Sequence, residues 1–408
     1  MKKKLNFLNK NNFYWIFIPF LLLTFFYLFK VPIGQTPDEP AHLNYIKHLA
    51  IFGSLPDYNF SGVAHHPPFY YLILTPIFIL FKNIYVLRGF YIVFSLLNLL
   101  VIKKIVELII PSEKLKRDLS LGTAIFCSLI PMYNFMAIGV NNDSLACLLG
   151  SLLIYYSVLS LNRFFREKEY LLWSLVFMAA IFTKIILWPA VFISGLTVLF
   201  TQKKQKYYTL LCFLLSFIGL CFWFYRNVSL YGQWDILGWE ELKKVEYMLL
   251  GNRLIYDHPR QWLVLLFHSF WGIFGWFSIY LPLVAYSLLR KATFLLILPF
   301  ALFIINFFII SKRKEKLSSL LFFSFFILTF VALIKDNLTF FHPQGRYLFP
   351  MLSFIGFYYT AGLFQISKYI SKYLFKVYRN FVFYTILVVP LLILNIVSLI
   401  TISNFYSK

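Results

Sequence analysis

Long apolar runs separated by short polar segments make up most of the chain. The runs are about 17–22 residues long, which is the length a helix needs to cross roughly 30 Å of hydrocarbon. Inside a membrane the backbone must satisfy its own hydrogen bonds, and runs of this kind do so as helices. No internal repeat or low-complexity linker interrupts the pattern. It therefore predicts an all-α polytopic membrane protein in which residues 1–408 form a single transmembrane domain.

Clusters of Lys and Arg between the runs predict the topology. Six such clusters occur, and the positive-inside rule places all of them in the cytoplasm. That assignment makes eleven runs transmembrane and puts the N-terminus in the cytoplasm. We expect the membrane to be a prokaryotic plasma membrane. The predicted spans are residues 13–29, 84–102, 119–139, 143–161, 170–184, 185–200, 207–226, 292–310, 317–334, 350–367 and 381–402.

Two large loops remain on the external side, at about residues 30–83 and 228–291. Loops of that size in a membrane protein usually carry function. In the first loop Leu43, Ile46 and Ala50 recur at helical spacing. This spacing predicts a short helix that lies on the membrane surface.

The second loop contains an apolar stretch, residues 262–289, that is long enough to span. Tryptophan and glycine gather within it at residues 269–276. Such a composition is typical of an interfacial belt or a re-entrant segment. We therefore expect residues 262–289 to stay outside the membrane as interfacial structure.

Composition agrees with these expectations and excludes an ordinary soluble domain. Hydrophobic residues make up 60% of the chain, which includes 50 phenylalanines, and the mean hydropathy is +0.74. A net charge of +22 would favour nucleic acid as a partner in a soluble protein, but here the basic clusters follow the topology, and no nucleic acid is expected. The four cysteines lie in predicted spans and have neither metal-site spacing nor a disulfide framework.

The first external loop contains an adjacent acidic pair, Asp38 and Glu39, flanked by Pro37 and Pro40. Carboxylates beside hydrocarbon are costly, so they indicate function. Neighbouring side chains diverge, which favours two separate tasks. If a helix begins after Pro37, Asp38 and His42 meet at i, i+4 spacing, as a pair of metal ligands would. The alternative is a helix cap, in which Asp38 or Thr36 caps a surface helix and Glu39 occupies its first turn.

Two histidines, His65 and His66, close the polar half of the same loop before a double proline. Held rigidly at the membrane surface, they could donate hydrogen bonds to a phosphate. Equally, they could be interfacial anchors at headgroup depth. With the acidic pair and His42 they offer enough ligands for a divalent cation, but their spacing matches no metal signature. We expect no cofactor, and a divalent cation is the one alternative.

Several isolated charged residues fall at the external ends of predicted spans. A cation there can hold a lipid phosphate, for which Arg offers bidentate contact, or it can extend to solvent. Arg346 differs because a Gly-Arg step bounded by prolines resembles a built site. Asp143, in an Asn-Asn-Asp turn, adds a carboxylate or caps a helix. The substrate-binding candidates are His42, His65, His66, Arg88, Asp143, Lys184, Arg226, Arg346 and Tyr347.

These groups together fit a lipid-linked substrate whose phosphate lies at the external interface. If the phosphate is the leaving group, the reaction needs a base for the acceptor and cations for the departing charge. An ionised Asp suits the base, a role typically worth about 10²–10⁴-fold in rate. Loss of one electrostatic stabiliser typically costs about 10²–10³-fold.

In its ordered motifs the chain resembles the GT-C superfamily of membrane glycosyltransferases. The likeness is to the branch with the protein O-mannosyltransferases and the lipid A aminoarabinose transferase. Each motif is weak alone, but they occur in the expected order over most of the chain. The motifs are Thr36-Pro37-Asp38-Glu39-Pro40-Ala41-His42, His66-Pro67-Pro68, Leu87-Arg88, Asn141-Asn142-Asp143, Thr183-Lys184, Trp223-Phe224-Tyr225-Arg226-Asn227, Ser269-Phe270-Trp271-Gly272 and Gln344-Gly345-Arg346-Tyr347.

The resemblance implies a polyprenyl-phosphate-linked sugar donor and transfer on the external side to a lipid, glycan or protein acceptor. Asp38 matches the catalytic base of the family, and Glu39 completes its acidic pair. Arg346 matches the loop expected near the lipid phosphate, and Lys184 and Arg88 are weaker matches.

Two other classes of function remain. A transporter or lipid flippase for an anionic lipid-linked substrate would tend to show repeat symmetry and binding residues at mid-membrane. A non-catalytic membrane scaffold would leave the Asp38 pair and the Arg346 loop unexplained. Because the carboxylates are predicted outside and no repeat is visible, a glycosyltransferase is the favoured interpretation.

Overall fold

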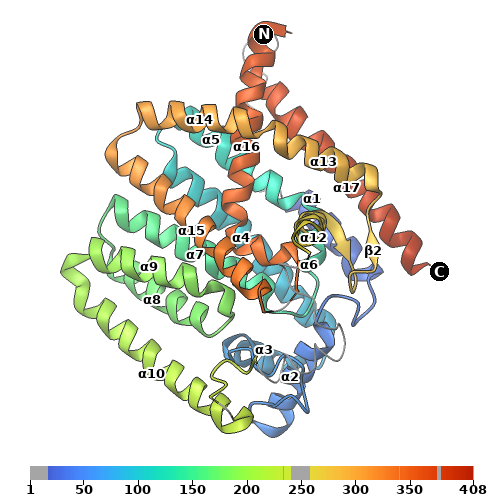
Figure 1. The fold of residues 1–408 in the computed structure, drawn as a ribbon, viewed down its shortest axis with the longest axis vertical. Coiled ribbons are helices and arrows are strands. Elements are labelled where there is room, and N and C mark those ends of the chain that lie inside the picture. Colours follow the sequence, from blue (N-terminus) through green and yellow to red (C-terminus); the bar gives the residue numbers. More distant parts are fainter. Residues whose placement is uncertain (1–16, 233, 240–257, 340, 375–377, 408) are drawn as a thin grey trace.

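The computed structural model describes residues 17–232, 234–239, 258–339, 341–374 and 378–407. Helices dominate, and most of them run side by side in one oblique direction (Figure 1). The described N-terminal half contains α1 (Phe17–Lys30), α2 (Glu39–Phe52), α3 (Phe69–Phe81), α4 (Ile84–Ile109), α5 (Glu113–Ser128), α6 (Pro131–Met136), α7 (Asp143–Asn162), α8 (Glu167–Ile181), η2 (Ile185–Leu187), α9 (Trp188–Thr201), η3 (Lys203–Gln205) and α10 (Lys206–Tyr231).

The second half continues the bundle, with a small hairpin inserted before its long helices. This hairpin is a two-stranded antiparallel sheet in which Ile273 pairs with Tyr280. The described elements are α12 (Pro259–Gly272), β1 (Ile273–Phe274), β2 (Ile279–Tyr280), α13 (Leu283–Leu295), α14 (Ile297–Ile310), α15 (Arg313–Asn337), η4 (Gly345–Met351), α16 (Leu352–Tyr369), η5 (Ile370–Leu374) and α17 (Arg379–Tyr406).

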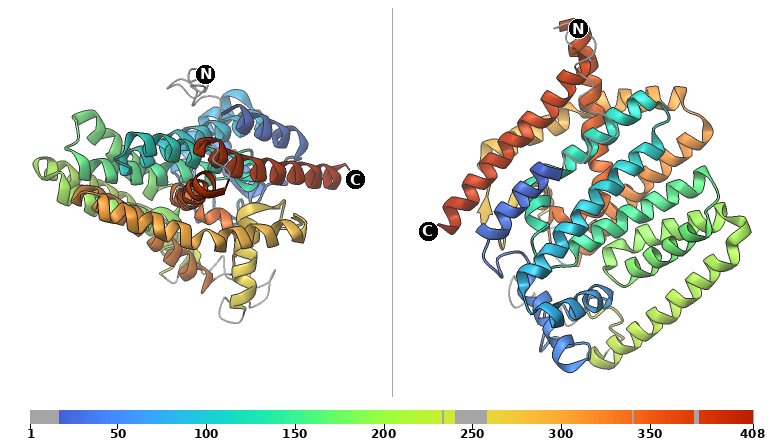
Figure 2. Two further views of the ribbon diagram at one scale, coloured as in Figure 1. Left: turned by 90° about the horizontal axis from the view of Figure 1, so that it is seen from above. Right: turned by 180° about the vertical axis from the view of Figure 1, so that it is seen from behind.

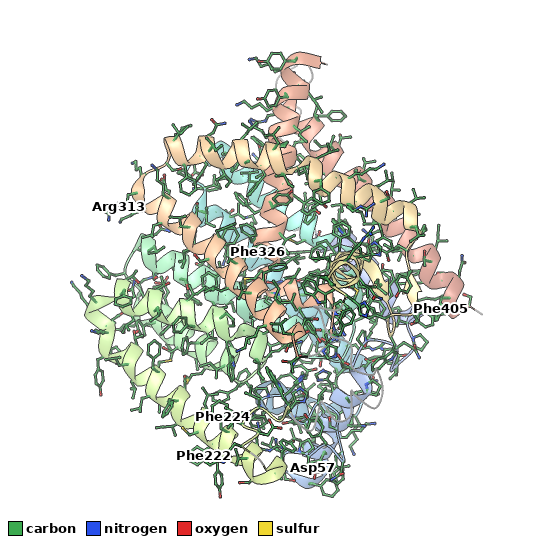
Figure 3. All side chains as sticks on the ribbon, viewed as in Figure 1. Asp57, Phe222, Phe224, Arg313, Phe326 and Phe405 are labelled. Atoms are coloured by element: carbon green, nitrogen blue, oxygen red, sulfur yellow. The ribbon has the colours of Figure 1, made fainter. Side chains whose placement is uncertain are left out.

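The protein is an integral membrane protein, as the apolar runs predict. Within the described residues six helical stretches are long and apolar enough to cross a bilayer. Their outward side chains are apolar as well: Phe222 on α10 is 72% exposed and projects from the bundle (Figure 3). Lipid is the solvent that such a surface fits. The six stretches are Asp143–Asn162, Lys203–Tyr231, Leu283–Ile310, Arg313–Asn337, Gly345–Tyr373 and Arg379–Tyr406.

Each of the eleven predicted spans coincides with helical structure over its described residues, and positions 13–16 of the first span lie outside them. The number of true crossings stays a prediction. One of the predicted spans is broken. The run predicted at 119–139 forms α5 and then the short α6, and the break precedes Pro131. Proline has no amide hydrogen and its ring clashes with the preceding turn, so a helix ends before it or restarts at it.

The stretch 262–289 differs from the prediction. Its first part is α12 and the hairpin, but α13 begins at Leu283, and Leu283–Ile310 is long and apolar enough to span. The candidate span that contains the run predicted from residue 292 therefore begins nine residues earlier. The reversal that precedes it uses Gly275 and Phe277, both at positive φ, and the backbone amide of Leu281 donates to the Tyr286 hydroxyl.

The short helix predicted around residues 43–50 is confirmed as α2, and its position on the membrane surface stays a prediction. It packs against α3, which arises from the apolar stretch that follows the paired prolines. Its inward face buries Leu43, Tyr45, Ile46 and Leu49, while Ile51 and Phe52 are exposed.

Alternation of helix direction collects the polar segments at one end of the bundle. The N-terminal ends of α2, α4, α7 and η4 and the C-terminal ends of α1, α8 and α10 lie at that end (Figures 1 and 2). The basic turns that begin at Lys203 and Lys312 lie at the opposite end. Residues far apart in sequence can therefore meet near the start of η4.

Gly345, the first residue of η4, allows the closest approach at this end. A Cβ at this position would lie 2.3 Å from the backbone nitrogen of Phe270 in α12. The Gly345 amide donates to the Ser269 hydroxyl at 2.8 Å, and that hydroxyl donates to the Pro343 carbonyl at 2.9 Å. A glycine is therefore required for η4 to lie directly against α12.

We expect Gly345→Ala to lower the free energy of unfolding by about 1–3 kcal/mol, because the methyl group must push η4 away from α12. Gly89→Ala is the matched control. No atom lies within 4 Å of its added Cβ, and helix propensity predicts a gain of about 0.5–1 kcal/mol. Thermal unfolding of both variants in detergent measures the difference. Equal melting temperatures for the two variants would contradict the close contact between η4 and α12.

Candidate functional site

Asp38 immediately precedes α2 and occupies an unusual backbone conformation. Its φ is 63° and its ψ is 0°, the left-handed region that non-glycine residues rarely adopt. It holds the N-cap position of α2, yet its side chain makes no capping hydrogen bond. Instead its Oδ2 accepts a hydrogen bond from Nη2 of Arg346 at 2.5 Å, and the carboxylate remains 38% exposed. The sequence allowed Asp38 to be either a functional carboxylate or a simple helix cap, and this geometry disfavours the cap.

Arg346 in η4 joins two carboxylates that lie far apart in sequence. Its Nη2 binds Asp38, and its Nη1 donates to Oδ2 of Asp143 at 3.1 Å. Its Nε donates to Oε1 of Gln344 at 2.5 Å. The side chain is only 2% exposed, so the guanidinium is held in place by these three partners.

Lys184 completes a compact group of charges. It follows α8, and its Nζ donates to Oδ1 of Asp143, the first residue of α7. The ring of Tyr347 lies beside both cations, 4.9 Å from Nζ of Lys184 and 5.3 Å from Cζ of Arg346. We call Asp38, Asp143, Lys184 and Arg346 the ion cluster. Its two carboxylates and two cations balance.

Glu39 turns away from Asp38 and pairs with Arg88 in α4. Arg88 donates from Nε to Oε1 at 2.9 Å and from Nη2 to Oε2 at 2.7 Å, and neither side chain is exposed. Glu39 also accepts from the amides of Gly34 at 2.7 Å and Val140 at 3.2 Å. Remaining donors of Arg88 reach the carbonyls of Val31 and Pro32. The acidic pair therefore splits, with Asp38 in the ion cluster and Glu39 inside the protein.

His42 and His66 lie next to the ion cluster and are linked through Tyr71. The Tyr71 hydroxyl is 2.9 Å from Nδ1 of His42 and 3.3 Å from Nδ1 of His66. Asn142 donates from Nδ2 to the Thr183 carbonyl and to Nδ1 of His66, both at 3.2 Å. Because the carbonyl fixes the orientation of the amide, Nδ1 of His66 must accept, and its proton lies on Nε2.

Three buried histidines of the first loop, His42, His65 and His66, are neutral at physiological pH. Burial lowers the pKa of His42 to about 3 and that of His65 to about 4, and it holds the pKa of His66 well below its usual value. Desolvation disfavours the imidazolium more than the nearby carboxylate of Asp38 favours it. The imidazoles can donate or accept hydrogen bonds, and they add no positive charge.

The carboxyl of Asp38 stays ionised. Burial is the largest single effect and raises its pKa, but the charge and hydrogen bond of Arg346, together with His42 and Lys184, bring the pKa down to about 2. Asp38 is therefore a carboxylate at neutral pH.

Arg226 and His65 lie outside the ion cluster. Arg226, near the end of α10, donates to the carbonyls of Pro56 and Ala64 and stacks on Trp223 at 4.9 Å. His65 stacks on Tyr58 with ring centroids 5.8 Å apart. In this structure Arg226 holds the first loop against α10, whereas His65 packs on another residue of the same loop.

Three polar partners were absent from the sequence-based candidates: Tyr71, Asn142 and Gln344. Asn142 and Gln344 stand inside quoted motifs and Tyr71 is three positions after one, so proximity to those motifs was the available signal. Tyr71 and Asn142 contact His66 across 5 and 76 positions of the chain, and Gln344 contacts Arg346 two positions away. The local sequence pattern does not reveal these contacts.

The described residues contain no group of three or more His, Cys, Asp or Glu arranged to hold a metal ion. The carboxylates of Asp38 and Asp143, which would be natural ligands, are paired with Arg346 and Lys184. Hard divalent cations prefer oxygen ligands free of competing cations, so this arrangement does not fit a metal centre.

Comparison with known proteins identifies the fold. No family model matches the chain, and no curated protein matches its sequence. The oligosaccharyltransferase of Archaeoglobus fulgidus is structurally similar. Its apo crystal structure has a TM-score of 0.51 at 11% identity over 96% of this chain and 56% of that one. Its complex with Zn and sulfate has a TM-score of 0.50 at 11% identity over 94% and 53%.

A third structure, of the same archaeal enzyme AglB with an inhibitory peptide and a dolichol-phosphate, gives a TM-score of 0.50 at 10% identity over 94% and 56%. The chain thus spans little more than half the length of these proteins. The likeness supports a GT-C-type fold for this multi-pass membrane protein. At 10–11% identity it concerns the fold alone.

We expect Glu39→Gln to destabilise the protein by about 3–5 kcal/mol, because it leaves the Arg88 cation buried without its counter-charge. Asp38→Asn is the matched control, since its carboxylate is partly exposed and Arg346 keeps Asp143 as a partner. Thermal unfolding in detergent measures both. The double variant Glu39→Gln, Arg88→Gln should recover part of the loss. A Glu39→Gln protein as stable as Asp38→Asn would refute the buried pair.

Proposed function

We propose that this protein is a glycosyltransferase that moves a sugar from a polyprenyl-phosphate-linked donor to an acceptor on the extracytoplasmic face of a prokaryotic plasma membrane. One observation carries the proposal. Arg346 brings Asp38 and Asp143 together with Lys184 at one end of a membrane-spanning bundle. That end is opposite to the basic turns, which the positive-inside rule places in the cytoplasm.

The proposed base is Asp38. It is ionised, partly exposed and fixed by its backbone at the start of α2. The acceptor hydroxyl transfers its proton to the Asp38 carboxylate while its oxygen bonds to the anomeric carbon of the sugar. The bond from that carbon to the phosphate oxygen breaks, and the polyprenyl phosphate leaves with the electron pair.

Arg346 and Lys184 are the proposed electrostatic stabilisers of the leaving phosphate. Fixed cations aimed at the charge that develops on the departing oxygen lower the barrier, since they need no reorganisation during the reaction. His66 can add a neutral hydrogen bond from Nε2. Because these residues supply the positive charge, the proposed transfer requires no metal cofactor.

Structural neighbours support a lipid-linked donor. The similar archaeal enzyme has been captured with a dolichol-phosphate and an inhibitory peptide, and a polyprenyl phosphate has the same chemistry. We assign the protein to the branch of protein O-mannosyltransferases and the lipid A aminoarabinose transferase on its ordered motifs. The acceptor is a lipid, a glycan or a protein.

Asp38→Asn should reduce sugar transfer by about 10²–10⁴-fold, because an amide cannot accept the proton. Arg346→Gln should cost about 10²–10³-fold. The assay uses purified protein, a panel of polyprenyl-phosphate monosaccharides and a membrane lipid extract, and measures released polyprenyl phosphate together with glycosylated product. Asp57→Asn is the matched control, because this carboxylate lies on the same loop and binds only Asn59 among the hydrogen bonds described for its side chain.

Undiminished turnover by Asp38→Asn would remove Asp38 as the base. Wild-type protein that moves the lipid-linked sugar across liposome membranes without transferring it would instead identify a flippase for an anionic lipid-linked substrate.

The pH profile provides an independent test. With the pKa of Asp38 at about 2 and the histidines neutral above about pH 4, kcat/KM should be flat between about pH 5 and pH 8, since it reports groups of the free enzyme. Lowering the pH should remove activity only as Asp38 becomes protonated. In Arg346→Gln the effect of burial on the pKa of Asp38 is less fully offset, so the acid limb of the residual activity should move to higher pH. An inflection near pH 6.5 in the wild type would contradict this assignment.

A further inference from the structure

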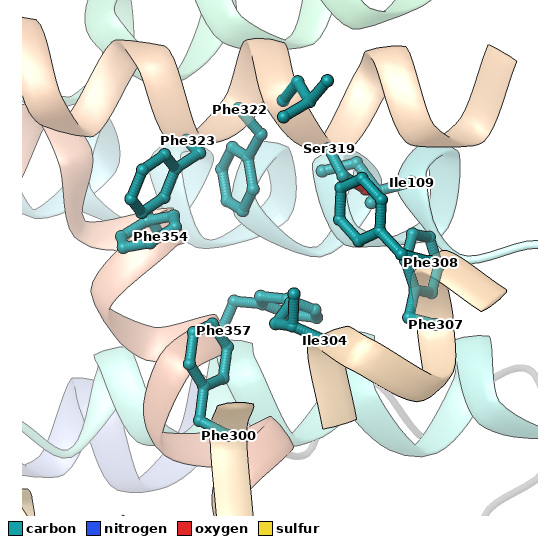
Figure 4. Close-up of a pocket in the computed structure, with 11 residues that line it drawn as sticks. Ile109, Phe300, Ile304, Phe307, Phe308, Ser319, Phe322, Phe323, Phe354 and Phe357 are labelled. Atoms are coloured by element: carbon teal, nitrogen blue, oxygen red, sulfur yellow. The ribbon is translucent and has the colours of Figure 1, made fainter. Parts of the chain in front are cut away.

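A second site lies away from the ion cluster. A cavity of about 260 Å³ lies between α14, α15 and α16, and Ile109 at the end of α4 also lines it (Figure 4). Of the eleven described residues that line it, seven are phenylalanine and only Ser319 is polar. A lining of this kind favours a hydrocarbon ligand and disfavours any sugar or charged group.

The aromatic side chains come from three helices and face one another across the cavity. Phe300 and Phe307 approach from α14, Phe322 from α15, and Phe354 and Phe357 from α16 (Figure 4). The rings of Phe322 and Phe354 contact edge to face, with centroids 5.4 Å apart, and those of Phe300 and Phe357 are 6.3 Å apart. The volume is below that of a typical pocket for a drug-sized ligand and suits a single chain of methylene groups.

The cavity lies close to a basic turn. Phe308, in the last turn of α14, is four positions from Lys312, and α15 begins at Arg313. Lys316 precedes the lining residues Ser319, Leu320 and Phe323 by three, four and seven positions. Residues at these spacings share one face of a helix. Lys316 therefore stands on the same face of α15 as the cavity wall, one turn nearer the membrane surface.

The cations of this turn, Lys312, Arg313, Lys314 and Lys316, outnumber its one carboxylate, Glu315. No described carboxylate forms an ion pair with Lys312, Arg313 or Lys316, although the Lys312 amide donates to Glu315. Lys312 and Arg313 are exposed. A cluster of Lys and Arg next to a membrane helix attracts anionic lipid headgroups, by about 1 kcal/mol per charge.

The donor of the proposed reaction belongs at the other end of the bundle. The α15 helix runs from the basic turn to Asn337, which contacts Trp262 and the segment before η4. Phe323 precedes Asn337 by fourteen positions, which corresponds to roughly 20 Å along the helix. A lipid phosphate bound at Lys316 would therefore be too far from the ion cluster to be the phosphate of the proposed donor.

We propose that this site binds an anionic phospholipid, with one acyl chain in the aromatic cavity and the headgroup phosphate on Lys312, Arg313 and Lys316. Charge complementarity selects the headgroup, and the cavity selects a hydrocarbon chain. The site is independent of sugar transfer, and it anchors the junction of α14 and α15 to the membrane leaflet that faces the basic turns.

The test compares phosphatidylglycerol with phosphatidylcholine of identical acyl chains, added to delipidated full-length protein in detergent and counted by native mass spectrometry. Phosphatidylglycerol should bind more tightly. Lys316→Gln should weaken its binding about fivefold, and the triple change Lys312→Gln, Arg313→Gln, Lys316→Gln should weaken it further. The matched control is Lys203→Gln, Lys204→Gln, Lys206→Gln, a basic turn at the same end between α9 and α10, which should bind as the wild type does.

A second variant tests the cavity itself. Ser319→Phe fills the cavity with an apolar ring and should reduce binding of both phospholipids at an unchanged melting temperature. Equal binding of the two headgroups, or an equal loss in the control triple variant, would overturn the proposal. Displacement of phosphatidylglycerol by a polyprenyl phosphate would also overturn it, and would assign the cavity to the lipid of the donor. All of these readouts are independent of transfer activity.

Discussion

The geometry of the candidate site depends on the buried ion pair between Glu39 and Arg88. Two charges without exposure are costly unless their hydrogen bonds are satisfied, and here both are. Glu39 accepts from Arg88 and from the amides of Gly34 and Val140. The pair thereby fixes the segment before α2, the start of α4 and the turn that leads to Asp143. Asp38 and Asp143, the two carboxylates of the ion cluster, are attached on either side of this junction.

Charge balance sets how the ion cluster can respond to a phosphate. Its carboxylates and cations cancel, and the neighbouring imidazoles are neutral, so the unliganded site carries no excess charge beside the hydrocarbon. A phosphate that contacts Arg346 must share it with Asp38. Because the guanidinium contributes most to lowering the pKa of Asp38, this sharing makes Asp38 a stronger base. In the proposed reaction, donor binding and activation of the base are therefore one event.

Much of the fold follows from local sequence. Apolar runs predicted the helices, and helical spacing predicted α2. Two features required information that the pattern lacks. The start of α13 at Leu283 depends on a hairpin whose residues sit at positive φ, and the tryptophan and glycine content resembled an interfacial segment. The partner of Glu39 was also hidden, because Arg88 looks like any isolated cation until the fold brings it across 49 positions. The motifs identified Asp38 and Arg346 as candidates, whereas only the tertiary structure shows them in contact.

Asp38 shows why the site must be argued from geometry and not from similarity at 10–11% identity. A left-handed backbone at a non-glycine residue costs of order 1–3 kcal/mol and persists only where surrounding contacts over-determine it. Here Pro40 lies in the first turn of the helix, Glu39 is fixed inside by Arg88, and Arg346 holds the carboxylate. An ordinary cap would need none of this, since Asp caps helices from the relaxed extended region. The strain turns the carboxylate away from its own helix and toward the ion cluster, where a base has a use.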